Sequence, residues 1–137
     1  MNTIKSPSKV STIEMSSNGE FLALGLHNGL VNLVSLDKQM NANYSKTINA
    51  HRSKVSAIKF IVNKEESLLI TSSYDNTMKI INIGNTADIV SLKGHKGWIH
   101  QIELSADKRR ITSVSEDKTV RNWFIYKKDI VKLLNKK

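Results

Sequence analysis

Two sets of histidine, hydroxyl and aspartate residues are the features of this sequence that most suggest chemistry. The first set is His51, Thr71, Ser73 and Asp75, and the second is His95, Ser113, Ser115 and Asp117. A hydroxyl activated by a histidine that an aspartate orients is the nucleophile of many hydrolases. The two sets, however, recur in the same order and phase, and one active site needs only one set. The pattern therefore predicts structural hydrogen-bond networks and a protein that is not an enzyme.

Metal and nucleotide chemistry find no support in the residue types and their spacing. The chain has no cysteine, which excludes disulfides and thiolate ligands. The four histidines are His27, His51, His95 and His100. Two of them belong to the repeated sets, and no carboxylate completes a spaced group of metal ligands with them. No Gly-x4-Gly-Lys-Ser/Thr loop for phosphate occurs either. We therefore expect neither a metal ion nor a cofactor.

Composition is that of one soluble globular domain with a hydrophobic core. Of the 137 residues, 39% are hydrophobic and 24% charged. No stretch approaches the roughly 18 apolar residues of a membrane span, and no apolar segment of a secretory signal follows the first residues. We therefore expect a cytoplasmic protein. The net charge is +9, and residues 107–137 hold ten Lys and Arg against four Asp and Glu. This basic end suggests an acidic partner, a nucleic acid or an anionic membrane, or else a solvated lysine-rich terminus.

The elements that must position these residues belong to an internal repeat. Residues 50–55 recur as 94–99, and residues 71–80 recur as 113–122, with the two histidines 44 and the two aspartates 42 positions apart. Residues 23–31 form a more diverged copy, in which an asparagine takes the place of the aspartate. A period of about 42 to 47 residues is close to one four-stranded propeller blade.

Short β-branched and apolar runs between polar turns predict the strands of each copy. The first strands are Val10–Met15, Val55–Ile61 and Ile99–Leu104, the second are Phe21–Leu26, Leu68–Ser73 and Ile111–Ser115, the third are Leu30–Leu36, Met78–Ile83 and Thr119–Ile125, and the fourth are Tyr44–Asn49 and Asp88–Lys93. A further strand at Asn2–Lys5 would precede the first copy, and Lys128–Lys136 has a helical pattern.

The predicted fold class is all-β, a partial propeller of three four-stranded antiparallel blades with a short basic C-terminal helix or tail. The expected units are blade 1 at residues 6–49, blade 2 at 50–94, blade 3 at 95–126 with only its first three strands, and the tail at 127–137.

The third copy resembles the WD-repeat family, with Gly94-His95 before its first strand, Ser113 and Ser115, Asp117, and then Trp123. The resemblance implies a network in which Asp117 bonds His95, His95 bonds one of the serines, and that serine reaches the Trp123 indole. Two positions depart from the family pattern of Trp-Asp: Phe124 follows Trp123, and the second copy has Ile81-Asn82. In the second copy the chain of bonds should therefore end at the hydroxyl. The first copy, with Ser6, Asn28 and Val34-Ser35, has lost the polar set.

Three blades are fewer than the roughly four to eight of known propellers, so two ends of the array would stay open. Two copies could close a six-bladed ring, each lending its N-terminal strand to the other. Alternatively, the chain is part of a longer propeller. The segment from Asp117 to Trp123, followed by a basic tail, resembles the end of the sensor region of bacterial STAND-type signalling ATPases, although no ATPase domain is present in this chain.

The family resemblance implies a protein-interaction scaffold or sensor module. Its partner-binding positions fall on His27, Lys54, Ser56, Tyr74, Trp98, His100 and Glu116. Tyr74 and Trp98 are the expected anchors, because aromatic residues dominate interface energies. For Trp98 the alternative is packing against the neighbouring blade, and for His27 and Glu116 it is a solvated turn.

Two other functions stay open. A basic surface could bind nucleic acid or an anionic membrane, which the repeats do not favour. It would use Arg109, Arg110, Arg121 and the lysine tail. The chain could also be a truncated piece of a larger propeller without an activity of its own.

Overall fold

A computed structural model describes residues 3–125, and within this range the chain forms eleven strands and no helix. The strands are β1 (Val10–Met15), β2 (Phe21–Leu26), β3 (Leu30–Leu36), β4 (Ala42–Asn49), β5 (Val55–Val62), β6 (Ser67–Ser73), β7 (Met78–Asn82), β8 (Asn85–Leu92), β9 (Ile99–Leu104), β10 (Arg110–Ser115) and β11 (Val120–Phe124). The expected all-β fold is confirmed. The helix expected over Lys128–Lys136 lies outside the described residues.

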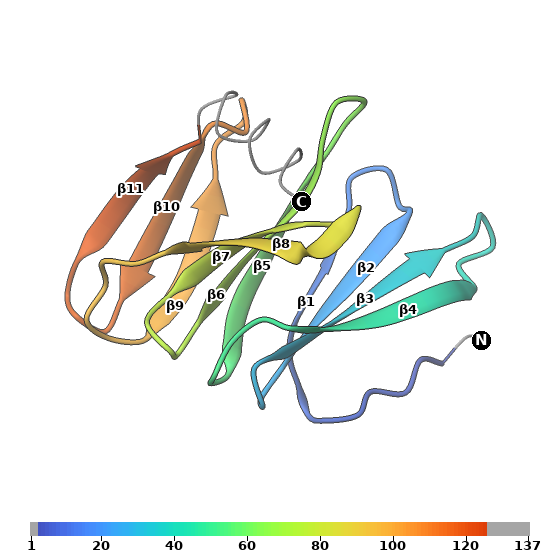
Figure 1. Ribbon diagram of the computed structural model, residues 1–137, viewed down its shortest axis with the longest axis horizontal. Coiled ribbons are helices and arrows are strands. Elements are labelled where there is room, and N and C mark those ends of the chain that lie inside the picture. Colours follow the sequence, from blue (N-terminus) through green and yellow to red (C-terminus); the bar gives the residue numbers. More distant parts are fainter. Residues whose placement is uncertain (1–2, 126–137) are drawn as a thin grey trace.

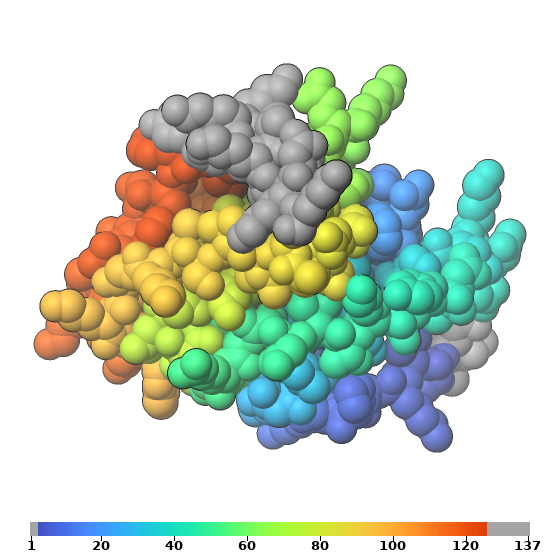
Figure 2. Space-filling model, in the orientation of Figure 1, coloured from blue at the N-terminus to red at the C-terminus, as the bar shows by residue number. Residues whose placement is uncertain are grey.

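The strands form three antiparallel sheets in chain order, which we call blades 1, 2 and 3 (Figure 1). Blade 1 contains β1–β4, blade 2 contains β5–β8, and blade 3 contains β9–β11. The first strands β1, β5 and β9 contact one another in turn, whereas β4 and β8 lie at the outer edges. Figure 2 shows the same order as successive bands of colour from blue to red, so each blade packs on the next one in the chain.

Most strand boundaries agree with the expectation, but the outer strands do not. Both begin earlier than predicted, β4 at Ala42 and β8 at Asn85. Only Ile48 of β4 is buried, so its exposed residues carry no apolar alternation that would mark its start. The strand expected at Asn2–Lys5 is wrong over its described part, because residues 3–5 pair with no strand. The third strand of blade 3, β11, is at the edge of its sheet, but residues 3–5 do not pair with it.

Tight turns between the second and third strands adopt the same backbone geometry in all three blades. Gly29, Asn76 and Lys118 stand at equivalent positions and have φ angles of 91°, 73° and 69°. Glycine takes this left-handed conformation without steric cost, whereas other residues do not. At Gly29 there is also no room for a side chain, because a Cβ atom would lie 2.2 Å from the carbonyl oxygen of His51. The turn of blade 1 therefore abuts the loop that enters blade 2.

The hydrophobic core consists of two layers, one on each side of blade 2. The first layer includes Leu33 of blade 1 and Leu69 of blade 2. The second includes Leu68 and Ile70 of blade 2 and Ile102 of blade 3. Successive side chains of a strand point to opposite faces, so β6 contributes to both layers. Blade 2 is thus covered on both faces, whereas blades 1 and 3 each have one face that packs on no other blade of the described chain.

Candidate functional site

The network in blade 3 joins the four side chains of the family pattern. His95 Nδ1 lies 2.8 Å from Asp117 Oδ2, and His95 Nε2 lies 2.7 Å from Ser113 Oγ. The Trp123 indole N–H donates to the same Ser113 Oγ at 2.9 Å. When the proton of the His95 ring is on Nδ1, Nδ1 donates it to the Asp117 carboxylate and Nε2 accepts a hydrogen bond from the Ser113 hydroxyl. Every donor in the network then has an acceptor.

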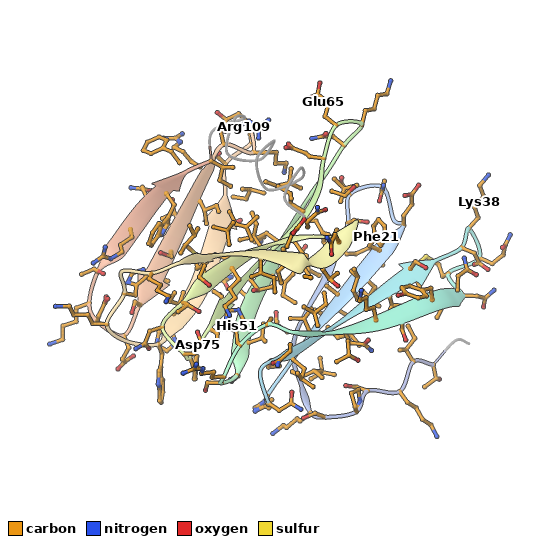
Figure 3. All side chains as sticks on the ribbon, in the orientation of Figure 1. Phe21, Lys38, His51, Glu65, Asp75 and Arg109 are labelled. Atoms are coloured by element: carbon orange, nitrogen blue, oxygen red, sulfur yellow. The ribbon has the colours of Figure 1, made fainter. Side chains whose placement is uncertain are left out.

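Blade 2 repeats this network without its last member. His51 Nδ1 lies 2.9 Å from Asp75 Oδ2, and His51 Nε2 lies 2.7 Å from Thr71 Oγ1. Because Ile81 replaces the tryptophan, the bonds end at Thr71. Asp75 also accepts the backbone N–H of Arg52 at 3.1 Å. Figure 3 shows His51 and Asp75 at the same end of the blade, where the network fixes the entering loop to the turn.

The second hydroxyl residue of each set, Ser73 or Ser115, has different hydrogen-bond partners from the first, Thr71 or Ser113. Ser73 Oγ donates to the backbone carbonyl of Ser53 at 3.0 Å and accepts the backbone N–H of Asp75 at 3.0 Å. Ser115 makes the equivalent two contacts in blade 3. These serines therefore bond the turn and its neighbouring loop through the backbone, and they contact neither histidine ring.

The geometry of both sets is unsuited to hydrolysis. The hydroxyls that meet the histidines, on Thr71 and Ser113, belong to residues that are 0% exposed. A nucleophile must reach the carbonyl carbon of a substrate, and these two have no route to one. Repetition and burial together argue for a structural role.

Both aspartates are held as carboxylates. For Asp75, burial raises the pKa, but hydrogen bonds from His51 and Thr77 outweigh it, so the pKa lies well below its usual value. For Asp117, the hydrogen bond from the Thr119 hydroxyl is the largest cause of a similarly lowered pKa. Each carboxylate therefore stays charged at neutral and mildly acidic pH.

A group of aromatic and charged side chains lies where blades 2 and 3 meet. The rings of Tyr74 and Trp98 stack with centroids 4.5 Å apart and planes only 4° from parallel. The His100 ring stands edge-on to both, at 5.5 and 6.4 Å. Lys54 Nζ lies 4.9 Å from the centroid of the Tyr74 ring, within range of a cation–π contact. Trp98 is 50% exposed, so the stack presents a flat apolar surface to solvent.

Backbone hydrogen bonds fix the turns and loops that carry these rings. Tyr74, in the turn of blade 2, donates its backbone N–H to the Lys54 carbonyl at 2.9 Å. Glu116, in the same turn of blade 3, donates to the Trp98 carbonyl at 2.8 Å. The Glu116 carboxylate also lies 2.8 Å from His100 Nε2. We call these five residues the aromatic cluster.

The aromatic cluster brings together five of the seven residues expected to bind a partner. Ser56 is not among them, because its hydroxyl lies 2.8 Å from that of Ser72 within the sheet. His27 is exposed in the turn of blade 1, and its pKa is lowered by desolvation and then by the charges of Lys9 and Lys54. The stacking of Tyr74 on Trp98 was missed by sequence reasoning, which placed both at one end of the blades but not in contact.

The three arginines expected to form a basic surface do not share one face of the described chain, and the lysine tail lies outside the described residues. Arg109 pairs with the Glu66 carboxylate at 3.3 Å. Arg110 lies on the open face of blade 3, and Arg121 alternates to the opposite face. Within residues 3–125 no group of three or more His, Asp or Glu is arranged to hold a metal ion. The same range contains no helix long and apolar enough to cross a membrane.

Comparison with curated proteins finds relatives that are much longer than this chain. Nuclear distribution protein PAC1 of Arthroderma otae is 30% identical over 86 residues, which are 58% of this chain and 19% of the relative. Ribosome biogenesis protein ytm1 of Aspergillus oryzae is 23% identical over 94% of this chain and 28% of its own length. Small ribosomal subunit protein RACK1y of Oryza sativa subsp. japonica is 27% identical over 53% of this chain and 22% of its own length. The chain thus spans about a fifth of the PAC1 relatives that it matches.

A solved structure supports the fold. One chain of the crystal structure of the mitotic checkpoint complex superposes with a TM-score of 0.72 at 21% identity, over 88% of this chain and 35% of that one. At this identity the likeness concerns the fold alone. The sequence profile described as "WD domain, G-beta repeat" matches residues 42–82 and 87–123. Each match begins in or near an outer strand and ends in the third strand of the next blade, and together they cover more than half of the chain. The chain therefore belongs to the WD domain, G-beta repeat family, and its three sheets are blades of a β-propeller.

Proposed function

We propose that this chain is a protein-interaction scaffold that binds a segment of a partner protein through the aromatic cluster. Proteins with WD repeats are typically interaction scaffolds. The observation that carries the proposal for this chain is the exposed, parallel stack of Tyr74 on Trp98. Aromatic anchors supply a large share of the binding energy at protein interfaces.

The aromatic cluster is organised before any partner binds. The backbone bonds of Tyr74 and Glu116 hold the loops, and the contacts among the rings of Tyr74, Trp98 and His100 restrict the side-chain rotamers. Binding therefore loses less conformational entropy than it would at mobile side chains, by about 0.5–1.5 kcal/mol for each side chain already fixed. A partner segment would lay an apolar or guanidinium group on the stack.

Nucleic-acid binding is not favoured by the described residues. Arg109 is paired with a carboxylate, and Arg110 and Arg121 lie on opposite faces of blade 3. A phosphate backbone needs several cations along one groove. Nor do the fully buried hydroxyls of Thr71 and Ser113 support a hydrolase.

Selection from a random peptide library on the immobilised chain tests the proposal. We expect selected peptides whose affinity falls at least tenfold in Tyr74→Ala and in Trp98→Ala. The matched control is Tyr44→Ala, which removes a tyrosine that is 60% exposed on β4, outside the aromatic cluster. Peptides that bind all three variants as well as the parent chain would show that the cluster is not the binding site. A library that yields no binder would count against the scaffold function itself.

A further inference from the structure

A pocket of about 240 Å³ opens at the end of blade 2 that carries the turn between β6 and β7. Six polar side chains line it, from the loop that enters the blade, from this turn, and from the nearby parts of β7 and β8: Arg52, Asp75, Thr77, Lys79, Ser91 and Lys93. Three of them are cationic and only one is anionic. The pocket shares no residue with the aromatic cluster, although Tyr74 of the cluster directly precedes Asp75 in the turn.

Strand pairing and the entering loop bring the three cations of this pocket together. Lys79 of β7 pairs with Ser91 of β8, so the two side chains point to the same side of the sheet. Lys93 is two positions after Ser91, which places it on that side as well. Arg52 comes from the loop, whose position is set by the hydrogen bond from its backbone N–H to Asp75 at 3.1 Å. Two lysines and one arginine therefore converge from separate elements.

The Asp75 carboxylate has no lone pair left for these cations. Its Oδ1 accepts the backbone N–H and the hydroxyl of Thr77 at 3.0 and 2.7 Å. Its Oδ2 lies 2.9 Å from His51 Nδ1 and accepts the backbone N–H of Arg52. A carboxylate offers about four lone-pair sites, and each of them meets one of these partners. Accordingly, within residues 3–125 no ion pair joins a cation of the pocket to Asp75 or to another acid.

The complete set of cations is particular to blade 2. We aligned the blades on the bulge of the first strand and on the turn between the second and third strands. In blade 1, the positions of the three cations hold the uncharged residues Pro7, Asn32 and Asn49. In blade 3, Lys96 and Arg121 occupy two of the positions, but that sheet has no fourth strand among the described residues to complete the pocket. A four-stranded blade thus folds without the three charges.

We propose that this pocket binds the phosphate group of a phosphorylated serine or threonine in a partner protein. Cations that gather without a counter-charge repel one another, and an anion between them removes the repulsion. The phosphate of such a residue carries a charge of about −1.5 to −2 at neutral pH and has three acceptor oxygens. The Arg52 guanidinium is able to bond two of these oxygens at once. Lys79, Lys93 and the Ser91 hydroxyl supply the remaining donors.

The lining favours a phosphorylated side chain over other carriers of phosphate. None of the six residues is aromatic, so no ring of the pocket stacks on the base of a nucleotide. None is apolar, so the acyl chain of a lipid finds no surface there. The cations surround one pocket and do not follow a groove, which suits a single phosphate and not a nucleic-acid backbone. A polypeptide that rests on the aromatic cluster reaches the pocket across one turn, and in this respect the inference rests on the proposed function.

Two random peptide libraries test the inference on the immobilised chain, one with a phosphoserine fixed at its centre and the other with a serine. The phosphoserine library should yield binders whose affinity falls at least tenfold when the phosphate is removed. Their affinity should also fall at least fivefold in Lys79→Gln and in Arg52→Gln, of which the second keeps the backbone N–H that bonds Asp75. The matched control is Lys64→Gln, which should leave the affinity unchanged. It removes the same charge beside Glu65, at the opposite end of blade 2 from Asp75 (Figure 3).

The outcome separates this inference from the proposed function. Phosphopeptides that bind Lys79→Gln and Arg52→Gln as tightly as the parent chain would overturn the inference, and so would equal binding of phosphorylated and unphosphorylated peptides. Binders from the serine library that depend on Trp98 would leave the scaffold function standing without the phosphate site. Phosphopeptides that depend on Lys79 but not on Trp98 would support the pocket and count against the aromatic cluster.

Titration with inorganic phosphate is a second measurement, and it needs no selected peptide. At constant ionic strength, the NMR resonances of the backbone amides of Arg52, Lys79 and Lys93 should shift and reach saturation. The variant Lys79→Gln should weaken this response, whereas Lys64→Gln should retain it, with far-UV circular dichroism confirming that both are folded. Shifts that do not saturate, or that are equal in the parent chain and in Lys79→Gln, would show that the pocket does not hold a phosphate group.

Discussion

Replacing Ser113 by alanine should destabilise the chain more than the loss of one hydroxyl would suggest. Its Oγ is the acceptor for the Trp123 indole N–H and the partner of His95 Nε2. Both groups would lose their partner in a site with no exposed surface at residue 113. A buried polar group without a partner costs about 1–3 kcal/mol, so Ser113→Ala should lower the free energy of unfolding by roughly 2–4 kcal/mol.

Blade 2 provides the internal comparison. Thr71→Val removes the equivalent hydroxyl, but only His51 Nε2 loses a partner, because Ile81 has no donor. We therefore expect a cost of about 1–2 kcal/mol, roughly half of that in blade 3. Both positions are fully buried, so a difference in burial cannot account for the contrast.

Equilibrium unfolding in urea, followed by far-UV circular dichroism, measures both costs. Trp123→Phe keeps an aromatic ring and removes the N–H, so the double variant with Ser113→Ala leaves one fewer group unpaired. The double-mutant cycle should show a coupling of about 1–2 kcal/mol. Additive effects of the two substitutions, or equal costs for Ser113→Ala and Thr71→Val, would refute this account of the network.

Three further predictions concern the turns. The lowered pKa of Asp75 means that its stabilising contribution is complete above the unfolded-state value of 3.8 and is lost as the pH falls below it. Asp75→Asn should therefore flatten the dependence of the unfolding free energy on pH between 4 and 2, and an unchanged slope would contradict the prediction. Gly29→Ala should cost more than Gly19→Ala, because both have positive φ but only Gly29 would place a Cβ atom against a carbonyl oxygen; equal melting temperatures would exclude that contact. Lys118→Gly should raise stability by about 0.5–1 kcal/mol in urea unfolding, because glycine avoids a steric cost of about 1–2 kcal/mol at this left-handed position and loses about 0.5–1 kcal/mol in chain entropy. A loss of stability would show that the lysine side chain contributes more.

The inner strands could be predicted almost to the residue because local chemistry marks both ends of each. Polar turns such as Asn28-Gly29 bound them, and their apolar runs face the blade-to-blade layers. The outer strand β4 carried no such signal, since nearly all its side chains are in solvent. The error at residues 3–5 has a different cause. Whether a segment becomes a strand there depends on a neighbouring edge, which the segment's own residues do not encode.

For the candidate site, the repeat phase predicted which residues share one end of the blades but not how they touch. Tyr74 and Trp98 are 24 positions apart and belong to different blades. Their stacking depends on the approach of one turn to the next loop, which the blade-to-blade packing sets. Ser56 was predicted at the same end, yet its hydroxyl bonds another hydroxyl within the sheet.

The position of β6 in both apolar layers bears on the order in which the chain opens. In a stack of units that interact only with their neighbours, the middle unit is stabilised by two interfaces and each end by one. Local opening should therefore begin in blades 1 and 3 and leave β6 for last. Amide protons of Leu68, Leu69 and Ile70 should be the slowest to exchange with deuterium, at rates set by global unfolding, whereas those of β4 exchange through fraying.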